Sequence, residues 1–310
     1  IMSSDWSSDV CSSDLQVAPG LWCLGRRESN VYLLQGTRET MLISGGTSYI
    51  LPDVLEQLAA YELDPASISQ CLILHAHFDH VGIIPYFKRT YPHLEIFALQ
   101  RGWDVLGMDR AINTINEYSR LTAEQMHLAE RLKDYDLDWG QDITGTTVQE
   151  GDSIDLGGRT VRIIETPGHS SCSLSAYVPE LKALFPSDGG GIPFKDEIIP
   201  SGNSNYTRYQ QSLHKLKDLE TDIICADHYG TVTGEEARRY IRDSIQSADQ
   251  YRRLVEKVYL REQDQEKTVA HLVKQVLDTR PDYFLPEAIL TGVTRQTVKH
   301  IAREMDSNPE

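Results

Sequence analysis

The 310-residue sequence has few cysteines, no long apolar run and no excess of basic residues. Without an uninterrupted run of ~18 apolar residues, no membrane-spanning helix is expected. The formal net charge of −16, with no stripe rich in Lys or Arg, repels polyphosphate backbones and argues against a nucleic-acid partner. The hydrophobic content of 40% is ordinary for a globular protein, so a packed chain is expected.

Cysteine usage indicates a reducing compartment. The five cysteines are odd in number and include no Cys-x-x-Cys pair, which gives little support for a disulfide framework. A cytoplasmic setting is therefore expected. Cys71 and Cys225 lie in apolar runs, so buried and inert thiols are expected there, although Cys225 shortly precedes His228.

Residues 1–15 differ from the rest because they repeat a Ser-Ser-Asp unit with no helical or strand period. They also lack the basic and apolar regions of a signal peptide. We therefore expect a non-native or disordered leader.

Short apolar segments separated by turn residues predict a series of strands. The continuous apolar run at 71–74 is typical of a central strand that is buried on both faces. Apolar positions at helical spacing predict a helical insertion at about 99–138. An Asn205 N-cap predicts a later helix, and a capping box from Thr233 to Glu236 predicts the start of an all-helical tail. The other predicted strands are 21–24, 31–34, 41–43, 95–98, 160–164, 172–178, 183–185 and 222–225.

The segment His75-Ala-His77-Phe-Asp79-His80 places four side chains able to bind metal directly after the buried strand. On an extended chain His75 and His77 share a face, and a following turn brings Asp79 and His80 around a second centre. The alternative is an accidental cluster or a solvated loop, which four such residues at this spacing disfavour.

Three more candidates follow predicted strands: His169 after Pro-Gly, Asp188 before three glycines, and His228 before Tyr229-Gly. Each alone fits a turn or a cap, but together with the cluster they favour a metal site. Five histidines lack comparable partners and are expected at the surface: His93, His127, His214, His271 and His300.

These motifs resemble the metal-binding motifs of the metallo-β-lactamase superfamily, over about residues 17–230. The resemblance implies an α/β fold of the αββα sandwich type, with a catalytic domain at 16–232 and a helical extension at 233–310. It also implies two divalent metal ions, zinc by default with iron or manganese as alternatives. The implied ligands are His75, His77 and His169 for one metal, Asp79, His80 and His228 for the other, and Asp188 as the bridge.

Three positions depart from the family pattern. Ser44 stands in place of the usual Asp, which removes a supporting contact but no ligand; Ser187 and Tyr229 stand in place of glycines. Within the superfamily, the ligand spacing and the two helical regions resemble the group of quinolone-signal response thioesterases. The apolar Ile192 departs from that group, in which an acidic residue lies beside the metals, and predicts a more open site.

The expected reaction is hydrolysis, because two divalent cations lower the pKa of a bridging water, and Asp79 orients the hydroxide and takes its proton. The sequence has no G-x-S-x-G motif, which argues against a serine hydrolase.

The expected substrate is a small acyl ester, thioester or lactone. The proposed pocket residues are Ile192, Phe194, Tyr229 and Phe284, with core packing as the alternative for the three aromatic ones.

Two other functions stay open. A phosphodiesterase or phosphotriesterase is disfavoured by the acidic charge, and a regulatory metal-binding protein is disfavoured because no ligand is lost. Gly191 disfavours a homoserine lactonase, for which a tyrosine would be expected at that position.

Substrate choice is expected to depend on the helices at 99–138 and 233–304 and on the loop at 189–194. The extension serves either as a lid or as a homodimer face.

Overall fold

The computed structural model describes residues 16–281, 283 and 285–307, so the leader lies outside the described residues. A seven-stranded sheet forms the first half of the fold, in the order β1 to β7. It is antiparallel from β1 to β4 and parallel from β4 to β7. Its strands are β1 Gln16–Ala18, β2 Leu21–Arg26, β3 Ser29–Gln35, β4 Thr40–Ile43, β5 Ile68–Leu72, β6 Glu95–Leu99 and β7 Thr146–Val148.

A six-stranded sheet forms the second half, in the order β15-β14-β11-β10-β9-β8. Only the pairing of β11 with β14 is parallel among its described strands. Its strands are β8 Ser153–Asp155, β9 Thr160–Glu165, β10 Leu174–Val178, β11 Ala183–Phe185, β14 Ile223–Cys225 and β15 Thr231–Thr233. A separate hairpin consists of β12 Ile192–Phe194 and β13 Glu197–Ile199.

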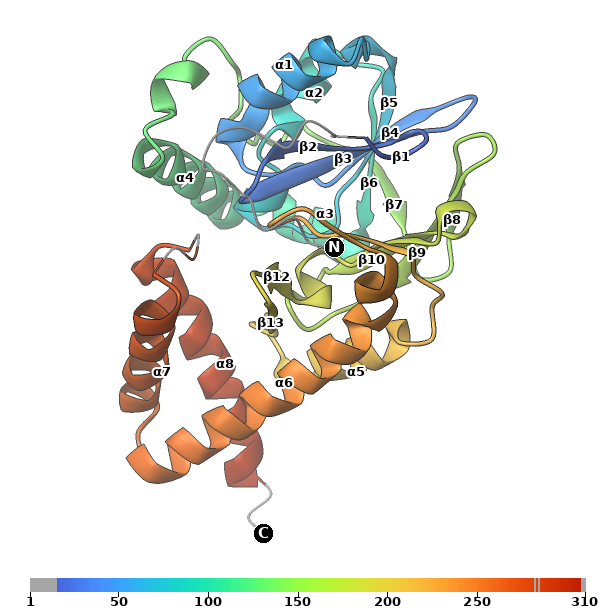
Figure 1. The fold of residues 1–310 in the computed structure, drawn as a ribbon. Helices are drawn as coiled ribbons and strands as arrows, with labels where there is room; N and C mark the ends of the chain where they lie inside the picture. The colour runs from blue at the N-terminus through green and yellow to red at the C-terminus, as the bar shows by residue number, and fades with distance from the viewer. Residues whose placement is uncertain (1–15, 282, 284, 308–310) are drawn as a thin grey trace.

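The two sheets pack face to face because their strands alternate apolar side chains between two cores. In and after β5, Leu72 and Leu74 point into the core between the sheets, whereas Cys71 and Ile73 point to the helices outside. On the far side of the second sheet, Tyr177 and Leu184 pack in a core with α6. Helices therefore cover both outer faces, which confirms the predicted α/β sandwich (Figure 1).

Four helices lie in the first half: α1 Leu51–Ala60, α2 Ile84–Thr90, α3 Gln100–Leu106 and α4 Asp109–Gln125. Four follow in the second half and the tail: α5 Tyr206–Leu216, α6 Gly234–Glu262, α7 Gln265–Thr279 and α8 Glu287–Ser307. The Asn205 cap is confirmed, because its side chain accepts from the Arg208 N–H. The predicted capping box at Thr233 is wrong. The Thr233 side chain makes no hydrogen bond to the first turn of α6, because this residue is extended in β15 and pairs with Ile223.

The helices α5 to α8 share a core of their own, to which Tyr206, Val255, Leu272 and Ile301 contribute. The tail packs on the second half of the sandwich through α5 and also through α6, which contacts the second sheet directly (Figure 1). No helix among the described residues is both long enough and apolar enough to cross a membrane.

Candidate metal centre

Four loops bring the predicted ligands to one edge of the sandwich. His75 follows β5, His169 follows β9, Asp188 follows β11 and His228 follows β14. Directly after β5 the backbone contacts both sheets. The N–H of Ile73 donates to the Phe97 carbonyl of the first sheet, and the carbonyl of Leu74 accepts from the N–H of Leu174 at the start of β10 of the second sheet. The two sheets are therefore joined by a backbone hydrogen bond immediately before the histidine cluster begins.

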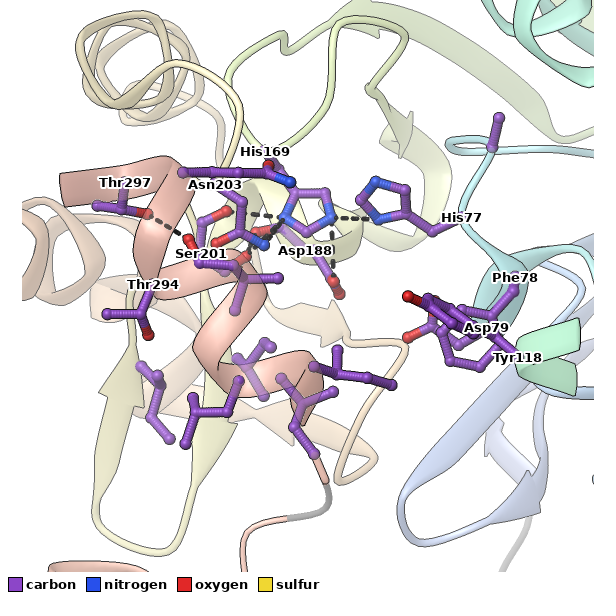
Figure 2. A pocket seen from close by; sticks show the side chains of 18 of the residues that line it. His77, Phe78, Asp79, Tyr118, His169, Asp188, Ser201, Asn203, Thr294 and Thr297 are labelled. Atoms are coloured by element: carbon purple, nitrogen blue, oxygen red, sulfur yellow. Dashed lines mark hydrogen bonds and ion pairs between the residues drawn. The ribbon is translucent and has the colours of Figure 1, made fainter. Parts of the chain in front are cut away.

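Three imidazoles form the first group of side chains. The Nδ1 atom of His77 lies 3.1 Å from the Nε2 atom of His75 and 3.0 Å from the Nε2 atom of His169. His75 and His169 are buried and His77 is partly exposed. Three nitrogen atoms therefore face one point, and Figure 2 shows the imidazoles of His77 and His169 turned toward each other.

Asp79, His80 and His228 form the second group. The Oδ2 atom of Asp79 lies 3.6 Å from the Nε2 atom of His80 and 3.7 Å from that of His228. Asp188 lies between the groups: its Oδ2 atom is 3.4 Å from His169 Nε2 and its Oδ1 atom is 3.4 Å from His228 Nε2. All seven predicted side chains thus converge.

The outward-facing nitrogens of three histidines each contact an oxygen that can only accept a hydrogen bond. The Nδ1 atom of His169 lies 2.7 Å from the Ser201 carbonyl, and that of His228 lies 2.7 Å from the Glu28 carbonyl. His80 Nδ1 contacts the Asp227 carboxylate at 2.9 Å. Each Nδ1 therefore carries a proton, and each Nε2 atom is turned inward, where a metal ion could take its lone pair.

The donor set fits divalent metal ions. Imidazole and carboxylate groups in one buried cluster suit zinc, iron or manganese. Within the described chain, the Nε2 atom of His80 is buried and has no hydrogen-bond partner. A buried polar atom of this kind needs a partner, and a cation between Asp79, His80 and Asp188 would supply one.

Burial and neighbouring charges set the protonation states. Burial lowers the pKa of His75 well below its ordinary value and lowers that of His77 to about 3. Burial alone would raise the pKa of Asp188, but His80 and His228 hold it well below its usual range. Burial disfavours a charged His80, yet Asp79 and Asp188 raise its pKa well above the ordinary value. The two carboxylates therefore favour positive charge between them.

Asp227 was not among the predicted site residues, but it supports both groups. Its Oδ2 atom accepts from His80 and, at 2.5 Å, from the hydroxyl of Ser187, which lies 3.2 Å from His75 Nδ1. Ser44 supports nothing of the kind: within the described residues its buried hydroxyl has no partner. The sequence signal that could have identified Asp227 is its position directly before His228.

Gly168 places His169 by a close approach of two backbones. Its φ is +139°, and a Cβ there would lie 2.2 Å from the backbone nitrogen of Tyr209 in α5. We expect Gly168→Ala to lower the free energy of unfolding by about 3 kcal/mol, because backbone strain and steric overlap combine. Urea denaturation of the metal-free protein measures this change.

Gly158→Ala is the matched control, since Gly158 also has a positive φ, of +73°, but nothing lies within 4 Å of its Cβ position. We expect it to cost about 1 kcal/mol. Equal costs at the two positions would contradict the steric argument.

A cavity of about 550 Å³, here called the chamber, opens from His77, Asp79, His169 and Asp188. Ile192 lines it as predicted, but Phe194 and Tyr229 are not among its lining residues. Phe194 is instead buried against Tyr229 and Tyr283, with ring centroids 5.1 and 5.5 Å away, because its side chain points into the packing behind the wall. Phe284 lies outside the described residues.

The sequence did not identify the individual wall residues from α4 and α8, because these helices carry no motif. The lining includes Ile115 and Tyr118 from α4, and Ile289, Leu290 and Val293 from α8. Of the histidines expected at the surface, His93, His127, His214 and His271 are exposed, whereas His300 is partly buried beside Glu304.

A model of the metallo-beta-lactamase superfamily matches residues 24–228, more than half of the chain and a range that includes all seven converging side chains. The chain belongs to this superfamily. The acyl-coenzyme A thioesterase MBLAC2 of Gallus gallus is 27% identical over 227 residues, which are 71% of this chain and 79% of that protein. A hydroxyacylglutathione hydrolase of Rhodopseudomonas palustris is 27% identical over 194 residues, which are 60% of this chain and 59% of that protein.

The same fold occurs in a beta-lactamase domain protein from Burkholderia ambifaria, with a TM-score of 0.67 at 17% identity. The likeness covers 97% of this chain and 90% of that one, so it extends to the helical tail. The family and its named relatives confirm the predicted enzyme class, a hydrolase of this superfamily. The narrower likeness to quinolone-signal response thioesterases stays a prediction.

Proposed function

We propose that the protein is a dinuclear metal hydrolase that cleaves an ester, thioester or lactone bond of a small acyl substrate. The observation that carries this proposal is the position of Asp188, whose carboxylate lies 3.4 Å from His169 of one ligand group and 3.6 and 3.4 Å from His80 and His228 of the other. In the proposed site His75, His77 and His169 hold one metal and Asp79, His80 and His228 the other. Zinc is the default, with iron or manganese as alternatives.

Divalent cations held by these residues would supply an acidified water near neutral pH and would polarise the substrate carbonyl. The chain's own groups supply the rest. Asp79 lies at the chamber surface, where its carboxylate orients the attacking water and takes its proton. The apolar chamber wall excludes bulk water from the reacting carbonyl. A thiolate leaves without strong acid help, so a thioester needs no further catalytic acid.

The relatives support an acyl substrate, since one is named as an acyl-coenzyme A thioesterase and another as a hydroxyacylglutathione hydrolase. The acidic charge of −16 supports a small molecule rather than a nucleic acid. Cys71, Cys172 and Cys225 form no disulfide, which supports a reducing, cytoplasmic compartment.

A substrate panel tests the proposal on protein loaded with Zn, Mn or Fe. We expect turnover of p-nitrophenyl esters and of an acyl thioester, loss of at least about 100-fold after chelation, and recovery on adding metal back. Bis-p-nitrophenyl phosphate, a homoserine lactone and a cephalosporin complete the panel. Fast cleavage of the phosphodiester with inert carboxyl esters and thioesters would overturn the proposal.

A further inference from the structure

The chamber extends from the proposed metals towards the C-terminal helices, and the two ends differ in character. The metal end carries His77, Asp79, His169 and Asp188, whereas the far end is bounded by α8 (Figure 2). Its volume of about 550 Å³ lies within the range of roughly 300–1,000 Å³ that is typical of small-molecule sites. There is therefore room for much more than the reacting carbonyl.

The walls beyond the metal end are mainly apolar. One face of α8 is turned to the chamber: the apolar residues come first along the helix and three polar ones follow, in the order Ile289, Leu290, Val293, Thr294, Gln296 and Thr297. Ile115 and Tyr118 of α4 line it as well, and Ile192 and Ile199 of the hairpin contribute further apolar surface. A ligand that fills this space gains by removing apolar surface from water.

Positive charge is scarce in the chamber. Apart from the proposed ligands, the charged residues that line it in the described chain are Arg110 and Arg280. Arg280 is paired with both carboxylate oxygens of Glu197, and Arg110 is exposed in the first turn of α4. A carboxylate or phosphate carried past the exposed Arg110 into the interior would meet only Arg280, which is already paired with Glu197, and burying an unpaired charge is strongly unfavourable.

We propose that the chamber binds an uncharged, apolar acyl group of roughly six to twelve carbons, aliphatic or aromatic, and thereby sets the substrate class. This inference rests on the hydrolase function proposed above. The acyl portion, rather than the leaving group, fits the chamber, because thiol and alcohol carriers are polar and lose hydration on burial. The scissile carbonyl then lies at the metal end and the carrier points to solvent.

Val293 is the best position at which to test this inference. It lines the chamber and is partly buried, yet it belongs to none of the four packed cores of the described chain. Val293→Trp therefore fills the chamber with little loss of core packing. Lys299→Trp is the matched control, since Lys299 is exposed on the same helix and does not line the chamber.

The experiment measures kcat/KM for p-nitrophenyl acetate, octanoate, benzoate and hemisuccinate with metal-loaded protein. We expect octanoate or benzoate to exceed acetate at least tenfold, and the negatively charged hemisuccinate to be the poorest substrate. Comparison of octanoate with benzoate separates an aliphatic from an aromatic preference. Val293→Trp should lower the ratio of octanoate to acetate at least tenfold, mainly through KM, and Lys299→Trp should keep the wild-type ratio.

A second measurement needs no turnover: octan-1-ol should raise the Tm of the wild-type protein and of Lys299→Trp but not that of Val293→Trp. Ester hydrolysis with no chain-length preference, or with a ratio unchanged by Val293→Trp, would overturn the inference and leave the hydrolase standing. No hydrolysis of any ester or thioester, together with a selective shift by octanol, would overturn the hydrolase and support the apolar ligand.

Discussion

Asp188→Ala is expected to lower the metal content from two ions per chain to one or fewer and to lower kcat on the order of 10³-fold. Its carboxylate lies within 3.6 Å of His80 and 3.4 Å of both His169 and His228, so its loss removes a ligand from both proposed metals. Elemental analysis of dialysed protein, together with ester turnover, measures both effects.

Asp218→Ala makes the same chemical change at an exposed position just after α5 and should match the wild type. An Asp188→Ala protein that kept two metals per chain and full activity would show that Asp188 does not bridge.

Asp227→Ala is expected to weaken metal affinity by roughly 10–100-fold, although Asp227 touches no metal in the proposed site. The substitution leaves Nδ1 of His80 and the Ser187 hydroxyl without their acceptor, so the imidazoles of His80 and His75 lose their fixed orientation. Competition with a chromogenic chelator measures the affinity, and the absorption spectrum of the cobalt-substituted protein reports the ligand geometry.

Ser44→Gly is the control for this experiment. Ser44 is buried with a positive φ of 67°, and its hydroxyl has no partner within the described residues, so glycine fits the backbone and removes no contact. If Ser44→Gly weakened metal binding as much as Asp227→Ala, the support would come from the first strand layer rather than from Asp227.

Local sequence predicts the strands and the ligand loops, whereas the sandwich arrangement and the grouping of the seven side chains came from the resemblance to a known superfamily. Each ligand loop comes directly after a short apolar segment bounded by turn residues, which favours a strand. The ends of β5, β9, β11 and β14 lie at one edge of the sandwich, so the loops that follow these strands bring residues that are distant in sequence close together. The ligand loops could therefore be predicted without knowing the packing of the helices.

The supporting contacts and the chamber depend on tertiary packing that no local pattern encodes. Asp227 reaches His80 across 147 positions of sequence, and Ser187 reaches His75 across 112. Phe194 illustrates the opposite error: an aromatic residue near the site suggests a pocket wall, but its side chain packs behind that wall. Which face of α4 or α8 meets the chamber is likewise fixed only once the tail has packed.

The division of the ligand loops between the two sheets affects how the protein is assembled. In the proposed site each metal takes ligands from both halves: His75 and His77 with His169, and Asp79 and His80 with His228. Neither half holds a complete ligand set, so high-affinity metal uptake has to await the docking of residues 16–148 onto the second sheet. Once bound, the ions act as cross-links between the halves, and separating the sheets requires their release.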